Sequence, residues 1–359
     1  MSNLLGRLKS SWLGLIGFFV LLALALIALL ADFLSPYPAD ELHADFSSTP
    51  PVLTQIHWTD PETGDSGPFL YGSQKIRNPF TSKVEFKEDT SLKIPINFWV
   101  HSWSYKFLGI WSSDLHLLGT SANTASSAGL FLFGTDKLGR DLFSRILIGT
   151  RLPLILGILV ALFSIGFGVF VGGISGYFGG ALDLLLQRFT EAFMSLPRLA
   201  LLLVLTAAVP IGWTPQYRFW GLVAAIALVG WAPVARVVRG QVLSLREESY
   251  VAAAKVFGAS SAHIIWKHLI PNTMSYLIVA ATLIAANAVV LESTISFLGF
   301  GLQEPNVSWG LLLQSAKSIP DLQLHPWVLI PGCFLAMAVV GFNFLGDALR
   351  DAVDPRMAL

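Results

Sequence analysis

The sequence predicts an all-α polytopic membrane protein with six transmembrane helices and a small β-containing insertion outside the membrane. Of the 359 residues, 54% are hydrophobic and only 13% are charged, and the mean hydropathy is +0.64, values that are not typical of a soluble globular chain. The hydrophobic residues are concentrated in blocks long enough to cross a bilayer. One long hydrophilic stretch, residues 36–133, separates the first block from the others.

The first hydrophobic block, residues 11–31, has no charge between Lys9 and Asp32. At about 1.5 Å per residue it crosses roughly 30 Å of hydrocarbon, so we interpret it as the first span. A cleaved signal peptide is the alternative, but the apolar core of a signal peptide has only about 7–15 residues. Because Arg7 and Lys9 precede the span, we expect the N-terminus in the cytoplasm.

The 36–133 stretch is predicted to form short strands and turns. Runs of branched and aromatic residues, at 52–58, 84–86 and 92–100, alternate with clusters of Pro, Gly, Asp and Ser. A disordered loop is the alternative, but the stretch contains more Trp and Phe than a solvated tail. We therefore expect a small external cap that contains β-strands.

An amphipathic helix is predicted in the segment GTDKLGRDLFSRILIGTR, residues 134–151, with Asp136 as its cap. Its apolar and polar side chains fall on opposite faces. The apolar face holds Leu138, Leu142, Phe143, Ile146 and Leu147, and the polar face holds Arg140, Asp141, Ser144 and Arg145. We expect this helix to lie flat at the membrane interface.

Five further spans are predicted, at residues 152–178, 189–209, 219–238, 273–291 and 327–345. In the second span, Gly168, Gly172, Gly176 and Gly180 recur every four residues and leave one helix face bare for close packing. A substrate-lining face is the alternative for this stripe. Glu292 follows the fifth span, and we expect it to be interfacial and solvated, because a charge at mid-membrane costs roughly 2.5–3.5 kcal/mol.

Six spans place both termini in the cytoplasm. Most basic residues outside the 36–151 stretch then fall in the short inner segments, and only Arg218 and Lys317 fall in the short outer loops. This distribution agrees with the tendency of Lys and Arg to stay on the cytoplasmic side.

A polar island, RVVRGQVLSLREESYVAAAKVFGASSAHIIWKHLIPN at residues 236–272, separates the fourth and fifth spans. It is expected to form two short helices in the cytoplasm, the first capped by Ser249 and ended by Gly258, the second capped by Ser260 or Ser261. Pro271 fits the first turn of the next span. The alternative is a plain cytoplasmic loop with some helix in it.

The spacing of Ala253, Ala254, Gly258 and Pro271 resembles the EAA loop of ABC importer permeases, the element that fits a groove on the ATPase subunit. The resemblance implies an ATPase-coupling loop. Its expected members are Tyr250, Ala253, Ala254, Phe257, Gly258 and Pro271.

Three positions in the loop depart from that motif. Ala252 stands where the motif has Glu, and His268 and Ile270 replace its Ile and Leu. The spacing of the motif is intact. With Ala252 in place of Glu, however, the loop lacks the side chain for any contact with the ATPase that depends on that Glu.

Four other segments extend the resemblance over residues 133–359: GTDKLGRDLFSR, GYFGGALD, ISFLGFG with the following SWG, and FNFLGDALRDAVDPR. Together with the loop they resemble the C-type permease subunit of the dipeptide/oligopeptide/nickel ABC importer family. The resemblance implies a type I importer fold in a bacterial inner membrane, with 134–359 as the permease core. Residues 1–35 are the expected N-terminal tail and first helix, and residues 36–133 are an insertion that departs from the shorter version of that family. The resemblance also implies three kinds of partner: a B-type permease in a heterodimer, two cytoplasmic ATPase subunits and an extracytoplasmic binding protein.

The sequence lacks the motifs of an enzyme. It contains neither the GxxxxGK[ST] phosphate loop nor an HExxH motif or a Cys/His cluster at metal spacing, so we expect no catalytic residue, no metal and no cofactor, with ATP bound by the partner ATPases. A facilitative transporter acting alone remains an alternative, and a membrane enzyme is a weaker one.

The substrate expected from the resemblance is a di- or oligopeptide, with oligosaccharide, glutathione or nickel as alternatives. No substrate-binding residue can be named. The 36–133 insertion is expected either to widen the docking surface for the binding protein or to cover the gate.

Overall fold

The computed structural model describes residues 11–59, 66–77, 84–107, 109–120, 129–210 and 212–353. The terminal basic residues Arg7, Lys9 and Arg356, which support the expected topology, lie outside these ranges. The chain divides into two compact units: Met1–Ala23, Pro153–Leu302 and Leu335–Leu359 form one, and Leu24–Leu152 and Gln303–Phe334 form the other.

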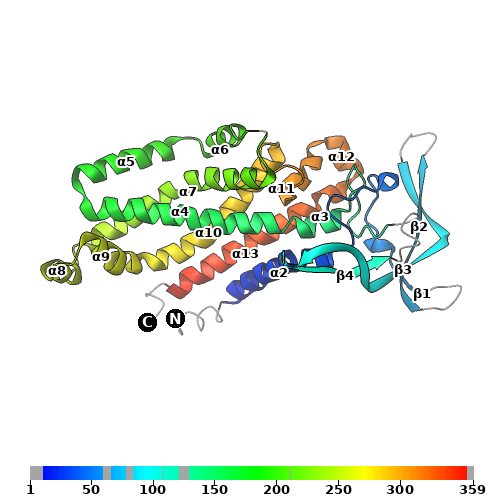
Figure 1. The fold of residues 1–359 in the computed structure, drawn as a ribbon, viewed down its shortest axis with the longest axis horizontal. Helices are drawn as coiled ribbons and strands as arrows, with labels where there is room; N and C mark the ends of the chain where they lie inside the picture. Colours follow the sequence, from blue (N-terminus) through cyan, green and yellow to red (C-terminus); the bar gives the residue numbers. More distant parts are fainter. Residues whose placement is uncertain are drawn as a thin grey trace. The chain divides into compact units, whose positions relative to one another are not determined.

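The first unit is helical (Figure 1). Its principal helices are α4 (Arg151–Phe178), α5 (Gly180–Ser195), α6 (Arg198–Ala207), α7 (Pro215–Leu245), α8 (Ser249–Val256), α9 (Ser261–His263), α10 (Ile270–Leu298) and α13 (Ile330–Val353). Proline opens two of the long helices, Pro215 in α7 and Pro271 in α10, where its missing N–H has no intrahelical partner to lose. Gly299, with φ of 95°, ends α10 in the left-handed conformation.

Among the described residues, five helical stretches are long and apolar enough to cross a membrane: Trp12–Leu34, Leu142–Phe178, Pro215–Leu245, Ser261–Leu298 and Pro326–Val353. The pair α5 and α6 makes a sixth if it counts as one span. The predicted fold class, a mostly helical chain with about six spans and a small β insertion, is confirmed.

The third span was expected at 189–209, with Pro197 as a residue that can bend or end it, and in the structure this range is divided between two helices. Helices α5 and α6 meet at an angle of 87°, with Leu196 and Pro197 between them. A proline disfavours helical geometry in the residue before it, and Leu196 is extended, with φ of −77° and ψ of 138°. The bend is therefore encoded at Pro197.

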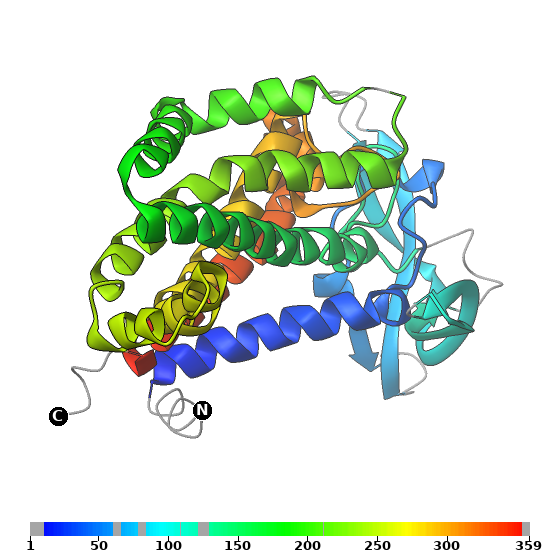
Figure 2. The same ribbon diagram turned by 60° about the vertical axis from the view of Figure 1, so that its left-hand side comes forward.

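The glycine stripe of α4 faces α7, and the two helices lie side by side in both ribbon views (Figures 1 and 2). A Cβ added at Gly168 would lie 2.7 Å from Cβ of Val234, and one at Gly172 would lie 2.5 Å from the carbonyl oxygen of Ala235. At Gly176 the nearest atom, at 2.8 Å, is again a carbonyl oxygen of α7. The two backbones are thus in contact because three glycines lack side chains.

Gly180 lies outside this contact. It begins α5 with φ of 60°, and a Cβ there would have no heavy atom of another element within 4 Å. The expectation of a four-residue packing stripe therefore applies to the three glycines of α4 alone.

The second unit contains an antiparallel sheet with strand order β1-β2-β3-β4. The strands are β1 (His57–Thr59), β2 (Ser66–Arg77), β3 (Val84–Phe107) and β4 (Trp111–Thr120). One side of the sheet packs on a small apolar core, which consists of Val52, Leu70, Ile96, Leu130 and Leu132. This unit also contains part of α2 (Trp12–Leu34) and the short helices α3 (Leu142–Ile148), α11 (Trp309–Leu312) and α12 (Ile319–Leu324).

Two details of the predicted strands are wrong. Residues 84–86 and 92–100 belong to the single 24-residue strand β3, and most of 52–58 is a 3-10 turn followed by the short β1. The polar residues between the two predicted segments suggest a turn, but Glu88 pairs with Ser73 of β2 and its side chain is exposed. Three of the tryptophans that argued for a packed core, Trp58, Trp99 and Trp111, are also exposed.

The prediction of a flat amphipathic helix at 134–151 is also wrong. Asp136 accepts hydrogen bonds from the backbone of Leu138 (2.8 Å) and Arg140 (3.0 Å) in a tight turn, and helix α3 begins only after Asp141. Asp141 and Arg145, which were expected on the solvated face, are each 1% exposed.

Charge pairing explains the burial of Arg145. Its Nη2 lies 2.5 Å from Oε1 of Glu304, and its Nη1 lies 3.7 Å from Oδ2 of Asp136. Glu304 comes from a segment more than 150 positions away in the sequence, so the pattern around Arg145 contains no sign of this partner. The three groups line a cavity of about 220 Å³ together with Arg140.

We predict that Asp141 makes the stability of this unit depend on pH. Burial raises the pKa of its carboxyl to about 7, whereas the unfolded chain loses this proton near pH 4. Between these values the folded state binds more protons, so the contribution of Asp141 to the free energy of unfolding falls as the pH rises from about 4 to about 7, by on the order of 4 kcal/mol.

The substitution Asp141→Asn removes this titration and keeps an oxygen acceptor for the start of α3. Relative to the wild type, the thermal midpoint of the variant in detergent is expected to be higher at pH 8 than at pH 5. Parallel pH profiles for the two proteins contradict the assignment.

We also predict that Gly172→Leu destabilises the packing of α4 on α7. The new side chain has no room between the two backbones, and overpacking of this kind typically costs about 1–3 kcal/mol or more. The matched control is Gly166→Leu on the same helix, where a Cβ meets no other heavy atom within 4 Å. Thermal unfolding in detergent is the measurement, and equal midpoints for the two variants contradict the close packing.

Candidate functional site

The predicted loop lies between α7 and α10. Helix α7 continues to Leu245, beyond the expected end of the fourth span at residue 238, so the first ten residues of the polar island are helical. Helix α8 follows, then a turn in which Gly258 has φ of 78°. A π-helical turn, Ile264–Leu269, joins α9 to α10.

The caps of the two short helices differ from each other. Ser260 caps α9, since its Oγ accepts a hydrogen bond of 3.3 Å from the backbone of His263. Ser249, the expected cap of the first helix, is instead the first residue of α8, and Glu248 occupies the cap position without a side-chain bond.

One face of the loop is packed against the long helices. Val251 of α8 and Leu269 of the π-turn are fully buried, and Ile264 is 1% exposed. They belong to one apolar cluster with Ile265 of the same π-turn and with residues of α4, α7 and α10: Val169, Val234, Val238, Val242, Ile270 and Leu277. The short helices are therefore fixed to the ends of three long helices.

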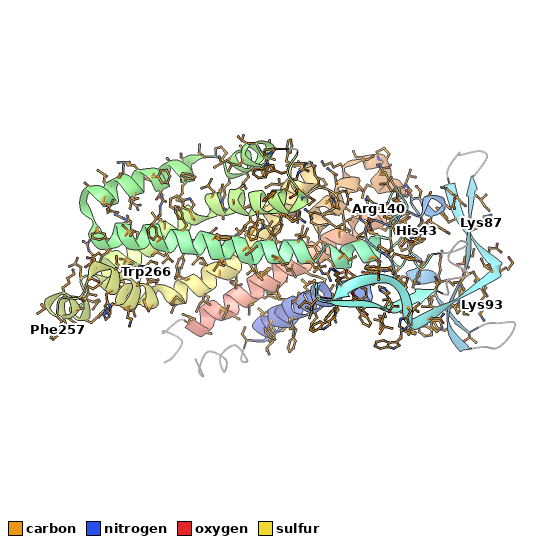
Figure 3. All side chains as sticks on the ribbon, viewed as in Figure 1. His43, Lys87, Lys93, Arg140, Phe257 and Trp266 are labelled. Carbon is orange, nitrogen blue, oxygen red and sulfur yellow. The ribbon has the colours of Figure 1, made fainter. Side chains whose placement is uncertain are left out.

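The opposite face of the loop is exposed and apolar. Val256 is 86% exposed and Phe257 is 90% exposed, and Figure 3 shows Phe257 at the free end of the loop, away from the long helices of its unit. Exposed large apolar groups on a rigid projection are typical of a surface that another protein covers.

Five of the six residues expected to couple this chain to an ATPase are on that exposed side. Tyr250, Ala253, Phe257, Gly258 and Pro271 are exposed, whereas Ala254 is partly buried against the apolar cluster.

A hydrogen-bonded amide joins the two ends of the loop. Nδ2 of Asn272, in the first turn of α10, donates to the carbonyl oxygen of His268 (2.6 Å) and to the hydroxyl of Tyr250 in α8 (3.4 Å). The exposed residues of α8 and of α10 thus form one connected surface.

An ion pair at the base of the loop was not predicted. The carboxylate of Asp183 in α5 accepts two hydrogen bonds of 2.6 Å from Nε and Nη2 of Arg239 in α7. Ser175 of α4 donates to the same carboxylate at 2.5 Å, and Arg246 donates to the carbonyl oxygen of Gly176 at 3.2 Å. These bonds lock α4, α5 and α7 together; the conspicuous Asp183 in GYFGGALD was the available signal.

An apolar pocket of about 480 Å³ lies on α4 and α7. It is lined by Phe163, Phe167, Trp220, Val223, Ala224, Ala227, Leu228 and Trp231. None of these side chains titrates, so the pocket can hold apolar groups but supplies no acid, base or nucleophile.

The expectation that Glu292 is solvated is wrong. Helix α10 continues to Leu298, past the predicted end of the span, and the side chain of Glu292 is fully buried. Its carboxylate accepts hydrogen bonds from the hydroxyls of Ser296 (2.8 Å) and Ser293 (3.2 Å). Ser296 in turn accepts a bond of 3.0 Å from the backbone of Leu302, so Glu292 organises the turn that follows α10.

Within the described parts of the chain, no group of three or more His, Cys, Asp or Glu side chains could hold a metal ion.

Two family models match the chain. The model described as binding-protein-dependent transport system inner membrane component matches residues 164–359, and the one described as N-terminal TM domain of oligopeptide transport permease C matches residues 2–51. The first match includes the whole loop and its ion pair.

Three curated relatives are similar over nearly two thirds of the chain. A putative peptide permease protein of Brucella suis biovar 1 is 40% identical, over 63% of this chain and 74% of the relative. The oligopeptide transport system permease protein OppC of Bacillus subtilis is 36% identical, over 63% of this chain and 72% of the relative. OppC of Haemophilus influenzae is 41% identical, over 64% and 71%.

We predict that Glu292→Ala lowers the free energy of unfolding by about 1–3 kcal/mol, because two buried serine hydroxyls lose their acceptor. The control is Asn287→Ala, on an exposed position of the same helix. A lower thermal midpoint in detergent is expected for the first variant alone. Equal midpoints indicate that the buried carboxylate contributes nothing to the fold.

Proposed function

This chain belongs to the family of binding-protein-dependent transport system inner membrane components, and from that membership we propose that it is the transmembrane permease subunit of an ATP-driven ABC importer of peptides. In this role it forms half of a translocation pathway and is not itself an enzyme. The relatives named as peptide or oligopeptide permeases support peptides as the substrate class. The alternative solutes, oligosaccharide, glutathione and nickel, have no such support.

The proposal rests on the loop, which has one exposed apolar face and one face packed against the long helices. A docking element must be exposed where its partner binds and rigidly joined to the helices that move. Phe257 meets the first requirement, and the buried Val251 meets the second.

We infer that the partner at the exposed face is a cytoplasmic ATPase subunit. The chain has no phosphate loop of its own, so ATP is bound by two such subunits. When they close, the loop moves with them as a rigid body. The Asp183–Arg239 pair and the apolar cluster then pass this displacement to α4, α5, α7 and α10.

The remaining partners and the orientation are part of the same proposal. A B-type permease supplies the other half of the pathway, and an extracytoplasmic binding protein delivers the peptide. Both termini and the loop lie in the cytoplasm. The excess of Lys and Arg in the segments that this topology places inside supports it.

The test is ATP-dependent peptide uptake by the assembled transporter in vesicles, with the variant Ala253→Arg. Ala253 is exposed, so the fold accepts the longer side chain, but its charge and bulk obstruct the fit of α8 to a groove. Uptake is expected to fall at least tenfold while membrane insertion and thermal midpoint are unchanged. Gly258 is less suitable, because its φ of 78° strains any other residue.

The matched control is Ala44→Arg, an exposed alanine in the other unit, for which uptake close to that of the wild type is expected. Normal uptake by Ala253→Arg contradicts the coupling role of the loop. Uptake by the isolated chain in vesicles without ATP contradicts the importer itself and favours a facilitative transporter.

A further inference from the structure

The hairpin formed by β3 and β4 carries four large apolar side chains on its surface. Phe98 is 55% exposed, Trp99 is 62%, Ile110 is 71% and Trp111 is 62%. Phe98 and Trp99 lie well along β3 from the turn, and Ile110 and Trp111 lie at the turn end of the hairpin. We call these four residues, which are spread along the hairpin, the hairpin patch. Exposed apolar side chains of this size and number indicate a covered surface.

The hairpin is fixed to the C-terminal end of helix α2. The rings of Phe33 and Trp99 have centroids 5.6 Å apart. The buried side chain of His116 in β4 lies between the two elements, with Nδ1 2.9 Å from the carbonyl oxygen of Asp32 and Nε2 2.8 Å from that of Trp103. The hairpin therefore stays at the end of α2 (Figure 1).

The end of α2 is itself held in place. Arg151 pairs with the carboxylate of Asp32 through two contacts, of 3.1 and 2.8 Å, and its Nε donates to the carbonyl oxygen of Ala28 at 2.7 Å. The last four carbonyl groups of a helix lack intrahelical partners, and His116 supplies one to that of Asp32.

The length of α2 indicates how deep the contact between Phe33 and Trp99 lies in the membrane. Helix α2 has 23 residues, which at about 1.5 Å per residue is close to the thickness of the hydrocarbon core. Phe33 is the last residue but one, so the ring of Trp99 that contacts it lies at the boundary between acyl chains and headgroups. Tryptophan is enriched at this depth because its ring is apolar and its N–H is polar.

From this placement we propose that the β3–β4 hairpin is an interfacial element, seated in the bilayer surface with the hairpin patch among the phospholipid headgroups and the upper acyl chains. One member of the patch, Trp99, contacts Phe33 of α2, a helix on which Leu26 and Leu29 are also exposed. The contact with an apolar helix that crosses the bilayer favours lipid over a protein as the occupant.

Two further features fit a headgroup depth. Strand β4 is an edge strand, so part of its backbone needs water or headgroup atoms as partners and could not enter the hydrocarbon core. Lys106, also exposed on the hairpin, can extend its ammonium group to a lipid phosphate. The inference requires only that α2 crosses the membrane, and it is independent of the transported solute.

A spin label tests the seating of the hairpin. The free Cys333 is replaced by serine, and the full chain, with the subunits that co-purify, is placed in nanodiscs of phosphatidylethanolamine and phosphatidylglycerol. One nitroxide replaces Ile110, in the patch, and the control nitroxide replaces Thr90, which is exposed on β3 outside the patch. Collisions with oxygen, which concentrates in lipid, are compared with collisions with a water-soluble nickel chelate.

The label at 110 is expected to collide at least several-fold more with oxygen than with nickel, and the label at 90 is expected to show the reverse. A double variant, Trp99→Asp with Trp111→Asp, is expected to move the label at 110 from lipid into water. The control variant Trp58→Asp, at another exposed tryptophan, is expected to leave the label in lipid. Equal nickel access at 110 and 90 overturns the proposal. Protection at 110 that appears only when a binding protein is added overturns it in favour of a protein partner.

Discussion

The two hydrogen bonds of 2.6 Å between Asp183 and Arg239 are the contact on which the first unit depends. They join α5 to α7 at the base of the loop, and Ser175 adds α4 to the same carboxylate. Both side chains are only partly buried, so the pair avoids most of the cost of removing charges from water. A charged pair at this point fixes the geometry of three helices without placing an ion at the centre of a membrane span.

The packing of α4 on α7 and this ion pair support each other. Glycine at 168, 172 and 176 allows the two backbones to touch, and Arg239 follows on α7 within the same line of contact. The last glycine of the stripe receives a hydrogen bond from Arg246 through its carbonyl oxygen. Close backbone contact and charge pairing thus occur along one seam that ends where the loop begins.

The architecture of the spans could be predicted from sequence because hydrophobic length and helix punctuation are local signals. Pro271 and the left-handed Gly258 were identified from spacing, and the structure has them in the expected positions. Prediction failed where a partner is distant in sequence. Arg145 was assigned to solvent because Glu304, its partner, lies far along the chain, and Glu292 was assigned to the interface because the serines that bond it follow the predicted end of the helix.

The β insertion is an intermediate case. Its class was predictable from the alternation of residue types, but the polar middle of β3 indicated a turn, because periodicity does not separate an exposed strand from a loop. Its aromatic residues argued for burial within the chain, although several of them are exposed on the hairpin. Composition identifies residues that avoid water, but it does not identify what covers them.

The exposed end of the loop has a consequence for the life of the subunit in the cell. A copy made without its partners carries Val256 and Phe257 bare in water, at 86% and 90% exposure, on a short helix that projects from the long ones. Quality-control proteases and chaperones recognise surfaces of this kind, and even small populations exposed to them change abundance several-fold. If the loop docks a partner as proposed, unassembled copies are expected to turn over fastest.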